Sequence, residues 1–330
     1  MSQPCYFCQS QSHKTIQNLD QHSQKKFTIR VCTICQSGRT EFNFQVETLA
    51  DYYPKTYFGT ESKRFFSAIE TLVRFSRILR GRYIVSDRLP NQRLRILDVG
   101  CGRALMLAHL RERGHDVYGT EFSDASSEHA RSILGSRIRT GAGIEALNFD
   151  PKVGFDVISF WHVLEHLDAP LEYLKKAHSL LNSDGRLIVE VPNFNSLQSR
   201  LSRSRWIYTE TPRHLFHFSP EGLERLLRTA GFSIGHSPHT FSFEYGFIGM
   251  IQGLLNYVCF TPNFLYYFLK NDRFKILDFR KWTSWFDLVM TVVLFPLAGF
   301  CGVLLELMSW IFGRGSVIRV RATVKTEKVD

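Results

Sequence analysis

Short apolar runs alternate with longer amphipathic stretches through the middle of the chain. Four runs have the length and composition of buried strands: residues 93–100, 115–122, 155–160 and 186–192. Strands that are apolar on both faces are typical of a parallel sheet, because the connecting helices cover both of its sides. The pattern between residues 93 and 243 therefore predicts a doubly wound, Rossmann-like α/β fold.

Two further strand patterns follow, and an insert separates them. Residues 219–230 predict a helix with Ser219 as its N-cap and Pro220 at the first helical position, and a strand is expected after Gly231. Residues 315–325 alternate between apolar and polar side chains, as a strand does. These two strands are expected to pair in the same sheet as the four runs, and the fold class that we predict for the core has a seven-stranded sheet.

The insert, residues 244–313, is rich in aromatic and aliphatic side chains. Residues 288–305 form an uncharged run of 18 residues, which is long enough to be a bilayer-span candidate, although Pro296 interrupts it near the middle. A single crossing is excluded, because the strands on either side belong to one sheet. A hairpin with residues 246–260, an interfacial attachment and a water-soluble lid over a site in the core remain open. We expect this segment to contact a membrane.

The charge balance points to anionic partners. The chain has 330 residues, with 41 Lys and Arg against 31 Asp and Glu and a formal net charge of +10. Basic residues at positions 200, 203, 205 and 213, and along an amphipathic helix expected between residues 61 and 83, would suit anionic headgroups or a diphosphate-linked lipid. The sequence shows no secretory signal pattern, which predicts a cytoplasmic protein, peripheral or monotopic on the inner face of the cell membrane.

Four of the seven cysteines form two close pairs, Cys5 with Cys8 and Cys32 with Cys35. Two Cys-x-x-Cys turns joined by a strand-like segment are typical of a ribbon that holds one tetrahedral zinc ion. Four thiolate ligands leave no position for a substrate, so the predicted zinc is structural. Because few basic and aromatic residues interleave in the ribbon, we expect no nucleic-acid partner.

These patterns divide the chain into five parts. They are a zinc ribbon at 1–40, a basic helical linker at 41–90, an α/β core at 91–243, an apolar helical insert at 244–313, and the last core strand with a tail at 314–330.

A candidate ligand loop lies where the first strand of the core ends. Asp98 precedes Gly100 and Gly102, and a helical pattern starts soon afterwards. Glycines allow positive φ angles and close approach of a ligand, and the following helix offers unpaired N–H groups. Glu121 closes the second strand, where an acidic side chain accepts hydrogen bonds from ribose hydroxyls. An ordinary tight turn and a dinucleotide site are the alternatives, although Leu105 occupies the place of the third glycine in the dinucleotide pattern.

From this loop onward the sequence resembles the class I S-adenosylmethionine (SAM)-dependent methyltransferases, whose first motif combines an acidic residue with Gly-x-Gly. The segments 155–170, 180–193 and 213–232 resemble successive parts of one broad methyltransferase family. The resemblance implies that SAM is bound by Asp98, Gly100, Cys101, Gly102, Glu121, Phe122, Gly143, Ile144 and Trp161. Gly143 stands where many members have an Asp that reaches the adenine amine, which leaves adenine recognition to backbone groups and apolar walls.

Three histidines are candidates for a general base. His162, Glu165 and His166 follow the strand at 155–160 in a pattern that is also found in zinc proteases. Their place at the carboxyl edge of the sheet, together with the family resemblance, favours the methyltransferase interpretation. The resemblance implies that His162 faces cofactor and acceptor and that His214 belongs to the acceptor wall. One of His162, His166 and His214 would remove the proton of a hydroxyl acceptor, or each could only satisfy neighbouring backbone groups.

The sequence therefore predicts a SAM-dependent methyltransferase that acts on a glycan or lipid-linked acceptor, with transfer to oxygen. Zinc ribbons of this type also precede the catalytic domain in methyltransferases of bacterial surface-glycan and sugar pathways, and the resemblance points there. A quinone-type or other small-molecule methyltransferase is the alternative among enzymes. A non-catalytic nucleic-acid-binding module on the same fold is the alternative of another class.

Overall fold

The chain divides into two compact units, each assembled from three separate segments. The computed structural model describes residues 3–20, 25–46, 48–53, 67–87, 89, 92–141, 144–150, 154–269 and 278–324. Unit 1 comprises residues 1–70, 192–222 and 239–318, and unit 2 comprises residues 71–191, 223–238 and 319–330. The core range expected at 91–243 is therefore shared between both units.

Unit 2 is built around a seven-stranded sheet with the order β10-β11-β8-β7-β4-β5-β6. Its strands are β4 (Arg95–Val99), β5 (Asp116–Glu121), β6 (Ile138–Thr140), β7 (Phe155–Trp161), β8 (Leu181–Pro192), β10 (Phe232–Ile234) and β11 (Val317–Val324). β4 is parallel to β5 and β7, β5 is parallel to β6, and β7 is parallel to β8, whereas β10 and β11 are antiparallel. The predicted Rossmann-like fold is confirmed, and so is the pairing of its last two strands.

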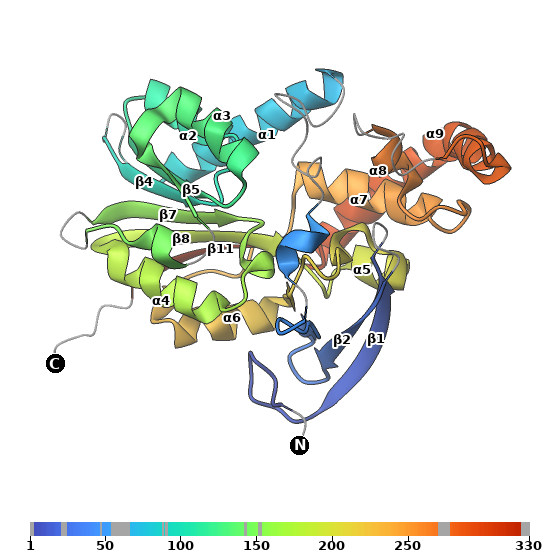
Figure 1. Cartoon of the computed structure of the whole chain (residues 1–330), viewed down its shortest axis with the longest axis horizontal. Coiled ribbons are helices and arrows are strands. Elements are labelled where there is room, and N and C mark those ends of the chain that lie inside the picture. The colour runs from blue at the N-terminus through green and yellow to red at the C-terminus, as the bar shows by residue number, and fades with distance from the viewer. Residues whose placement is uncertain are drawn as a thin grey trace. The chain divides into compact units, whose positions relative to one another are not determined.

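Helices cover both faces of this sheet, as a doubly wound fold requires. α1 (Ser67–Val85), α2 (Leu105–Glu112) and α3 (Asp124–Leu134) lie on one face, and α4 (Pro170–Leu180) and α6 (Pro220–Thr229) lie on the other (Figure 1). Short 3-10 helices cover Gly135–Arg137, Ile144–Leu147 and Leu164–His166. Leu107 of α2, Leu134 of α3 and Val157 of β7 belong to one buried apolar cluster. This core holds the carboxyl ends of the central strands in fixed register.

Local signals in the sequence set several element ends. Ser219 is the N-cap of α6, because its Oγ accepts a hydrogen bond from the Gly222 N–H at 3.0 Å. The helix expected at 61–83 is observed as α1, and residues 61–66 lie outside the described residues. β10 ends at Ile234, so the strand after Gly231 is shorter than its apolar run. Pro238, which cannot donate to a ladder, follows soon after.

The described residues of unit 1 form a small antiparallel sheet and four α-helices. The sheet has the order β1-β2-β3-β9, with β1 (His13–Leu19), β2 (Lys26–Cys32), β3 (Gly38–Thr40) and β9 (Phe216–His217). The helices are α5 (Leu197–Ser202), α7 (Phe243–Leu255), α8 (Phe264–Leu269) and α9 (Trp282–Ile311), with 3-10 turns at Leu49–Tyr52, Arg203–Arg205 and Ile207–Thr209. β9 pairs with β3 although it lies far from it in the sequence. The cysteine ribbon is therefore part of a larger sheet and not a separate one.

α9 continues through Pro296, so the interruption expected there is wrong. A proline inside a helix removes one backbone hydrogen bond, and packing against a neighbouring helix can support the helix in spite of that loss. α7 gives that support: a Cβ atom at Gly302 would lie only 2.9 Å from Cγ1 of Ile251. Within the described ranges, α9 is the helix whose length and composition would allow it to cross a membrane. Its most apolar stretch of 18 residues has a mean hydropathy of 2.5, and 17% of that stretch is buried.

Candidate active site

The bend between β4 and α2 uses its two glycines for different purposes. Gly100, Gly102 and Ala104 all have positive φ angles, of 72°, 55° and 55°. A Cβ atom at Gly100 would lie 2.4 Å from Cγ2 of Val163, so this glycine makes room for protein. A Cβ atom at Gly102 would have no heavy atom within 4 Å. The open position of the bend is therefore at Gly102, where a ligand can approach the backbone.

The backbone and the thiol of Cys101 both make contacts within the protein. Its N–H donates to the Thr120 carbonyl at 2.9 Å, and its own carbonyl accepts from Ala104 at 3.0 Å. Its Sγ would lie 2.7 Å from a Cβ atom at Gly119, so the thiol packs over β5. Burial raises the pKa of this thiol well above its usual value, which keeps it neutral. These contacts leave Cys101 little to offer the donor for which the sequence proposed it.

Glu121 fastens the bend to the end of β5. One carboxylate oxygen accepts from the Gly102 N–H at 2.7 Å, and the other accepts from the Ser123 N–H at 2.8 Å. Burial raises the pKa of this carboxyl, although the backbone hydrogen bonds oppose the shift. Each carboxylate oxygen has a second lone pair, so both can still accept from a ligand hydroxyl. Phe122, the next residue, exposes 48% of its surface.

Asp98 is buried at the end of β4. Its Oδ1 accepts a hydrogen bond from the Ser159 hydroxyl of β7 at 2.7 Å. Burial raises its pKa to about 7, while Ser159 and the positive charges of Arg80 and Arg77 lower it. The carboxyl group therefore changes its charge near neutral pH, and an approaching cation would favour its ionised form.

His162 is held by two carboxylates. It has a φ angle of 56°, its Nε2 lies 2.9 Å from Oε1 of Glu190, and its Nδ1 lies 3.6 Å from Oε1 of Glu165. Burial alone would lower the pKa of this imidazole, but the contacts with Glu165 and Glu190 raise it. A buried imidazolium between two carboxylates is poorly suited to take a proton from an acceptor.

Glu190 of β8, which our reasoning from the sequence missed, is the centre of a buried charge cluster. It also accepts from Nε of Arg319 at 2.6 Å and lies 3.4 Å from Arg80. Burial alone would raise the pKa of Glu190, but the charge of Arg319 and the other cations lower it. Trp161 has the guanidinium groups of Arg80 and Arg319 5.0 and 5.3 Å from its ring centroid. A single acidic residue inside the apolar run 186–192 was the signal in the sequence.

Comparison with known proteins identifies the fold family. A family model described as a methyltransferase domain matches residues 73–237, which is half of the chain. The chain belongs to the methyltransferase domain family. The predicted resemblance to class I SAM-dependent methyltransferases is thereby confirmed.

Curated relatives match about the same part of the chain. The ubiquinone biosynthesis O-methyltransferase of Cereibacter sphaeroides is 29% identical over 160 residues, which cover 44% of this chain and 63% of the relative. The protein of the same name from Maricaulis maris is 29% identical over 179 residues, covering 49% of this chain and 70% of the relative. A solved SAM-dependent methyltransferase from Archaeoglobus fulgidus is 18% identical with a TM-score of 0.48, over 84% of this chain and all of that one. The chain thus spans less than two thirds of the length of the first relative.

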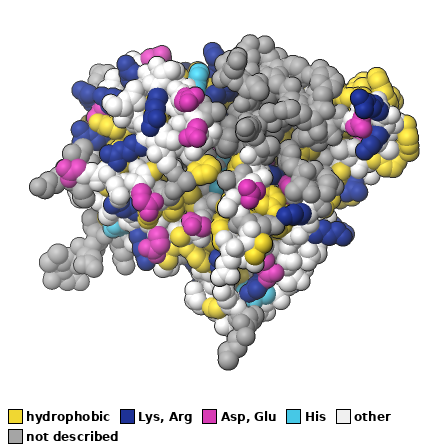
Figure 2. All heavy atoms as spheres, viewed as in Figure 1, with side chains coloured by type: hydrophobic (Ala, Val, Ile, Leu, Met, Phe, Trp, Pro, Cys, Tyr) yellow, Lys and Arg dark blue, Asp and Glu magenta, His cyan; other side chains and the backbone are white. Residues whose placement is uncertain are grey.

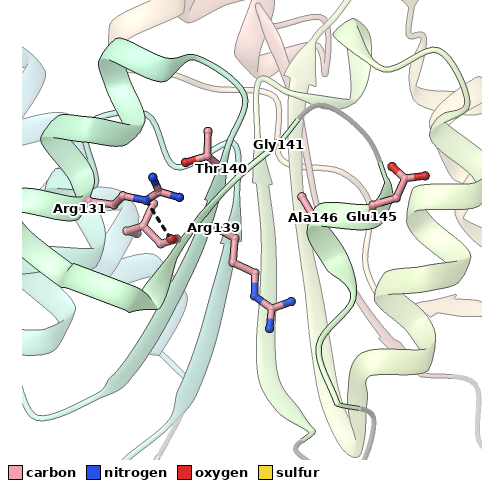
Figure 3. A pocket seen from close by; sticks show the side chains of 7 residues that line it. Arg131, Arg139, Thr140, Gly141, Glu145 and Ala146 are labelled. Atoms are coloured by element: carbon pink, nitrogen blue, oxygen red, sulfur yellow. Dashed lines mark hydrogen bonds between the residues drawn. The ribbon is translucent and has the colours of Figure 1, made fainter.

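A cavity of about 340 Å³ lies beside the edge strand of the methyltransferase domain. It is lined by Arg131, Ile138, Arg139, Thr140, Gly141, Glu145 and Ala146. Figure 3 shows the charged ends of Arg139 and Glu145 pointing away from one another. Thr140 pairs with Glu121 across the β5–β6 ladder. Ile144 begins the 3-10 helix beyond this cavity, whereas Gly143 lies outside the described residues.

The other candidate bases lie in different units. His166 ends a 3-10 turn after β7 in the methyltransferase domain, partly buried, and its N–H donates to the Val163 carbonyl at 2.9 Å. His214, in unit 1, is buried, and its Nδ1 donates to the Tyr208 carbonyl at 2.9 Å. Both remain predicted bases.

The four predicted zinc ligands come together in unit 1. The sulfur atoms of Cys5 and Cys35 lie 3.6 Å apart, and those of Cys8 and Cys32 lie 3.5 Å apart. All four sulfurs lie within 4.8 Å of one another. A Zn–S bond of about 2.3 Å in a tetrahedron places sulfurs about 3.8 Å apart, so this cluster has the size of a zinc site.

The two cysteine turns also share one backbone design. Gln9 and Gln36, each four residues after the first cysteine of its pair, have φ angles of 61° and 60°. Their N–H groups donate to the carbonyls of Cys5 and Cys32 at 2.9 and 3.1 Å. Two matching loops that direct four thiols to one point fit a metal better than they fit a packed core.

Proposed function

We propose that this protein transfers a methyl group from SAM to a hydroxyl oxygen of a small-molecule acceptor. The observation that carries the proposal is the bend at Gly102, which is open to a ligand and fastened by Glu121. The names of the curated relatives support the quinone-type alternative better than the glycan or lipid-linked acceptor that was the main expectation.

Glu121, Asp98 and the edge cavity each have a proposed part in donor binding. SAM supplies a methyl group on a sulfonium. Glu121 would accept hydrogen bonds from the ribose hydroxyls, with its orientation preset by two backbone N–H groups. Ionised Asp98 would favour the positive charge of the amino acid part. The edge cavity beside Thr140 and Ile144 would receive the adenine.

The chemical step needs alignment and removal of one proton. The acceptor oxygen displaces the sulfur in line, so the new carbon–oxygen bond forms as the carbon–sulfur bond breaks. His166 is the base to test first, because it follows β7 in the methyltransferase domain and is only partly buried. His162 is better explained as the partner of Glu190.

Calorimetry and a transfer assay test this proposal. The full chain should bind S-adenosylhomocysteine and should transfer labelled methyl groups from SAM to a quinone precursor that carries a hydroxyl group but not to an oligosaccharide. Methylation of the oligosaccharide alone would restore the glycan interpretation. Salt-sensitive binding of nucleic acid without donor affinity would support the non-catalytic alternative.

We also propose that Cys5, Cys8, Cys32 and Cys35 hold one structural Zn²⁺. Metal analysis of the full chain should give one zinc per chain, and Cys35→Ser should lower that ratio. Because a closed four-thiolate site contributes to folding, chelation should lower the melting temperature of the protein. Full zinc content in the Cys35→Ser variant would contradict this ligand set.

A further inference from the structure

The orientation of α9 is the reverse of that in a water-soluble helix. The side of α9 that is buried in unit 1 consists of small and polar residues: Ser284, Asp287, Thr291, Ala298, Gly302, Glu306 and Ser309. The exposed side carries Trp282, Trp285, Phe286, Val289, Val292, Val293, Phe295, Leu297, Phe300, Val303, Leu304, Leu307, Met308, Trp310 and Ile311. A helix between a core and water normally turns its apolar stripe inward.

Specific contacts hold this orientation. Near one end, the Asp287 carboxylate accepts from the N–H groups of Phe260 and Thr261 at 2.7 and 2.9 Å. Near the other end, the Glu306 carboxylate accepts from Gln198 at 3.1 Å and from the Ser316 N–H at 3.3 Å. Rotation of α9 to bury its apolar side would break these hydrogen bonds.

Close packing adds a steric constraint. A Cβ atom at Gly246 of α7 would lie 2.7 Å from Oε1 of Glu306. Larger residues in α7 would therefore push α9 away. The inward side of α9 is shaped for α7, and its outward side requires another apolar partner.

The exposed apolar surface extends beyond α9. Phe243, Ile248, Tyr257, Val258 and Phe260, in α7 and the segment after it, are also exposed. Figure 2 shows hydrophobic side chains gathered around the end of α9, with Lys and Arg side chains among them. Monomeric soluble proteins rarely expose a continuous apolar surface of this extent.

Charge and aromatic residues point to a lipid surface. Between Trp282 and Ile311 the charged residues of α9 are Asp287 and Glu306, and both are buried. Arg280 and Lys281 precede the helix, and Arg314 follows it. Tryptophans near both ends and flanking cations are typical of segments that meet anionic headgroups.

α9 is suited to lie in the interface rather than to span the bilayer. Protein contacts accompany it along its length, from Phe260 and Thr261 near its first turns to Gln198 near its last ones. A spanning position would carry these polar contacts into hydrocarbon, where each exposed polar group is costly. An in-plane position immerses one side only.

We propose that the outward side of α9 inserts into the interface of an anionic lipid bilayer, while its polar inner side remains bound to unit 1. The membrane then covers the side chains that unit 1 leaves exposed. The anchoring surface lies on α9 and the segments beside it, and it does not depend on the nature of the methyl acceptor.

Vesicle flotation of the full chain tests the proposal. Wild-type protein should float with vesicles of phosphatidylcholine and phosphatidylglycerol, and the double variant Val293→Glu/Phe300→Glu should bind at least about tenfold more weakly. Val293 and Phe300 expose 64% and 67% of their surface, so these changes leave the buried side of α9 intact. Equal flotation of variant and wild type would overturn the proposal.

A matched control separates membrane insertion from a general effect of added charge. Val46 and Phe44 expose 76% and 52% of their surface in another part of unit 1. The double variant Phe44→Glu/Val46→Glu should float like wild type. A weakening equal to that of the α9 variant would contradict insertion through α9.

Two further measurements define the partner. Replacing Arg280 and Lys281 by Gln should weaken binding to anionic vesicles by about tenfold and leave binding to pure phosphatidylcholine unchanged.

Acyl chains that carry bromine should quench the fluorescence of Trp282, Trp285 and Trp310. The lack of quenching in bound protein would overturn insertion. If wild-type protein ignores vesicles and forms a dimer that Val293→Glu/Phe300→Glu dissociates, a second copy covers α9 instead.

Discussion

Glu121 and Glu190 are two buried carboxylates of one sheet with opposite surroundings. Glu190 lies among Arg319, Arg80 and His162, and these cations lower its pKa against the effect of burial. Glu121 accepts from two backbone N–H groups, and burial raises its pKa. A carboxylate that is surrounded by cations of the protein stabilises the fold through these ion pairs. A carboxylate held only by backbone donors keeps acceptor capacity for a ligand.

Removing the charge of Glu190 should produce the largest effect. Glu190→Gln removes the buried negative charge that Arg319, Arg80 and His162 share, so the free energy of unfolding should fall by about 3–5 kcal/mol. Urea unfolding of the full chain at neutral pH measures this loss. Because the folded-state pKa of Glu190 is lowered, its contribution is present above pH 4.5 and is lost as the pH falls further.

A surface carboxylate provides the control for this measurement. Glu172 exposes more than half of its side chain and pairs with Lys175 at 3.1 Å. Glu172→Gln should change the free energy of unfolding by less than about 0.5 kcal/mol. An equally small change for Glu190→Gln would contradict the stabilising role that we assign to Glu190 and not to Glu121.

Replacing Glu121 should affect the donor more than the fold. Glu121→Ala removes the acceptor proposed for the ribose and loosens the bend at Gly102, so affinity for S-adenosylhomocysteine should fall by about tenfold to a hundredfold. Titration calorimetry measures this change. Glu121→Gln, which keeps one acceptor oxygen, should lie between alanine and wild type. Unchanged affinity in the alanine variant would count against this binding site.

Asp98 should show a dependence on pH opposite to that of Glu190. Burial raises its pKa from 3.8 to about 7, so the folded chain keeps a proton that the unfolded chain has released. Its contribution to the free energy of unfolding should therefore fall as the pH rises from about 4 to about 7, by at most about 1.4 kcal/mol per pH unit. Urea unfolding across this range should be flatter for Asp98→Asn, and identical slopes would contradict the assignment.

The smallest predicted effect concerns the hydroxyl that donates to Asp98. Ser159→Ala removes a hydrogen bond of 2.7 Å that favours the ionised carboxylate. The midpoint of the Asp98 pH profile should rise by less than about one pH unit. Ser179, an exposed serine of α4 whose hydroxyl donates to the Lys176 carbonyl, offers a control. Ser179→Ala should leave the profile in place, and a matching rise would show that the effect is not specific.

Several features of the fold and site could be predicted from nearby residues. The apolar runs, the cap at Ser219 and the two cysteine turns each depend on a few neighbouring side chains. Their physical causes are burial, hydrogen bonding and backbone geometry, and all three act over short stretches of the chain. The place of Glu121 at the end of β5 follows from the same patterns, because parallel strands end at one edge.

Other features depend on partners that are distant in sequence. His162 was expected to face cofactor and acceptor, but Glu190 and Glu165 hold it. Gly100 was assigned to the donor, but Val163 occupies the space beside it. Arg319 reaches Glu190 from a strand near the end of the chain. The spacing of apolar residues does not predict such pairs, because the two residues of a pair belong to separate local patterns.

The sequence by itself determined the order of strands and helices, the cysteine turns and the glycine bend, since local apolar spacing and backbone freedom dictate them. The tertiary structure alone decided how buried charges pair and which side of α9 faces unit 1. Pairing depends on distances between remote segments, and the orientation of α9 depends on Asp287, Glu306 and the glycines that let α7 approach. Charge and close packing, rather than hydrophobicity, set that helix in place.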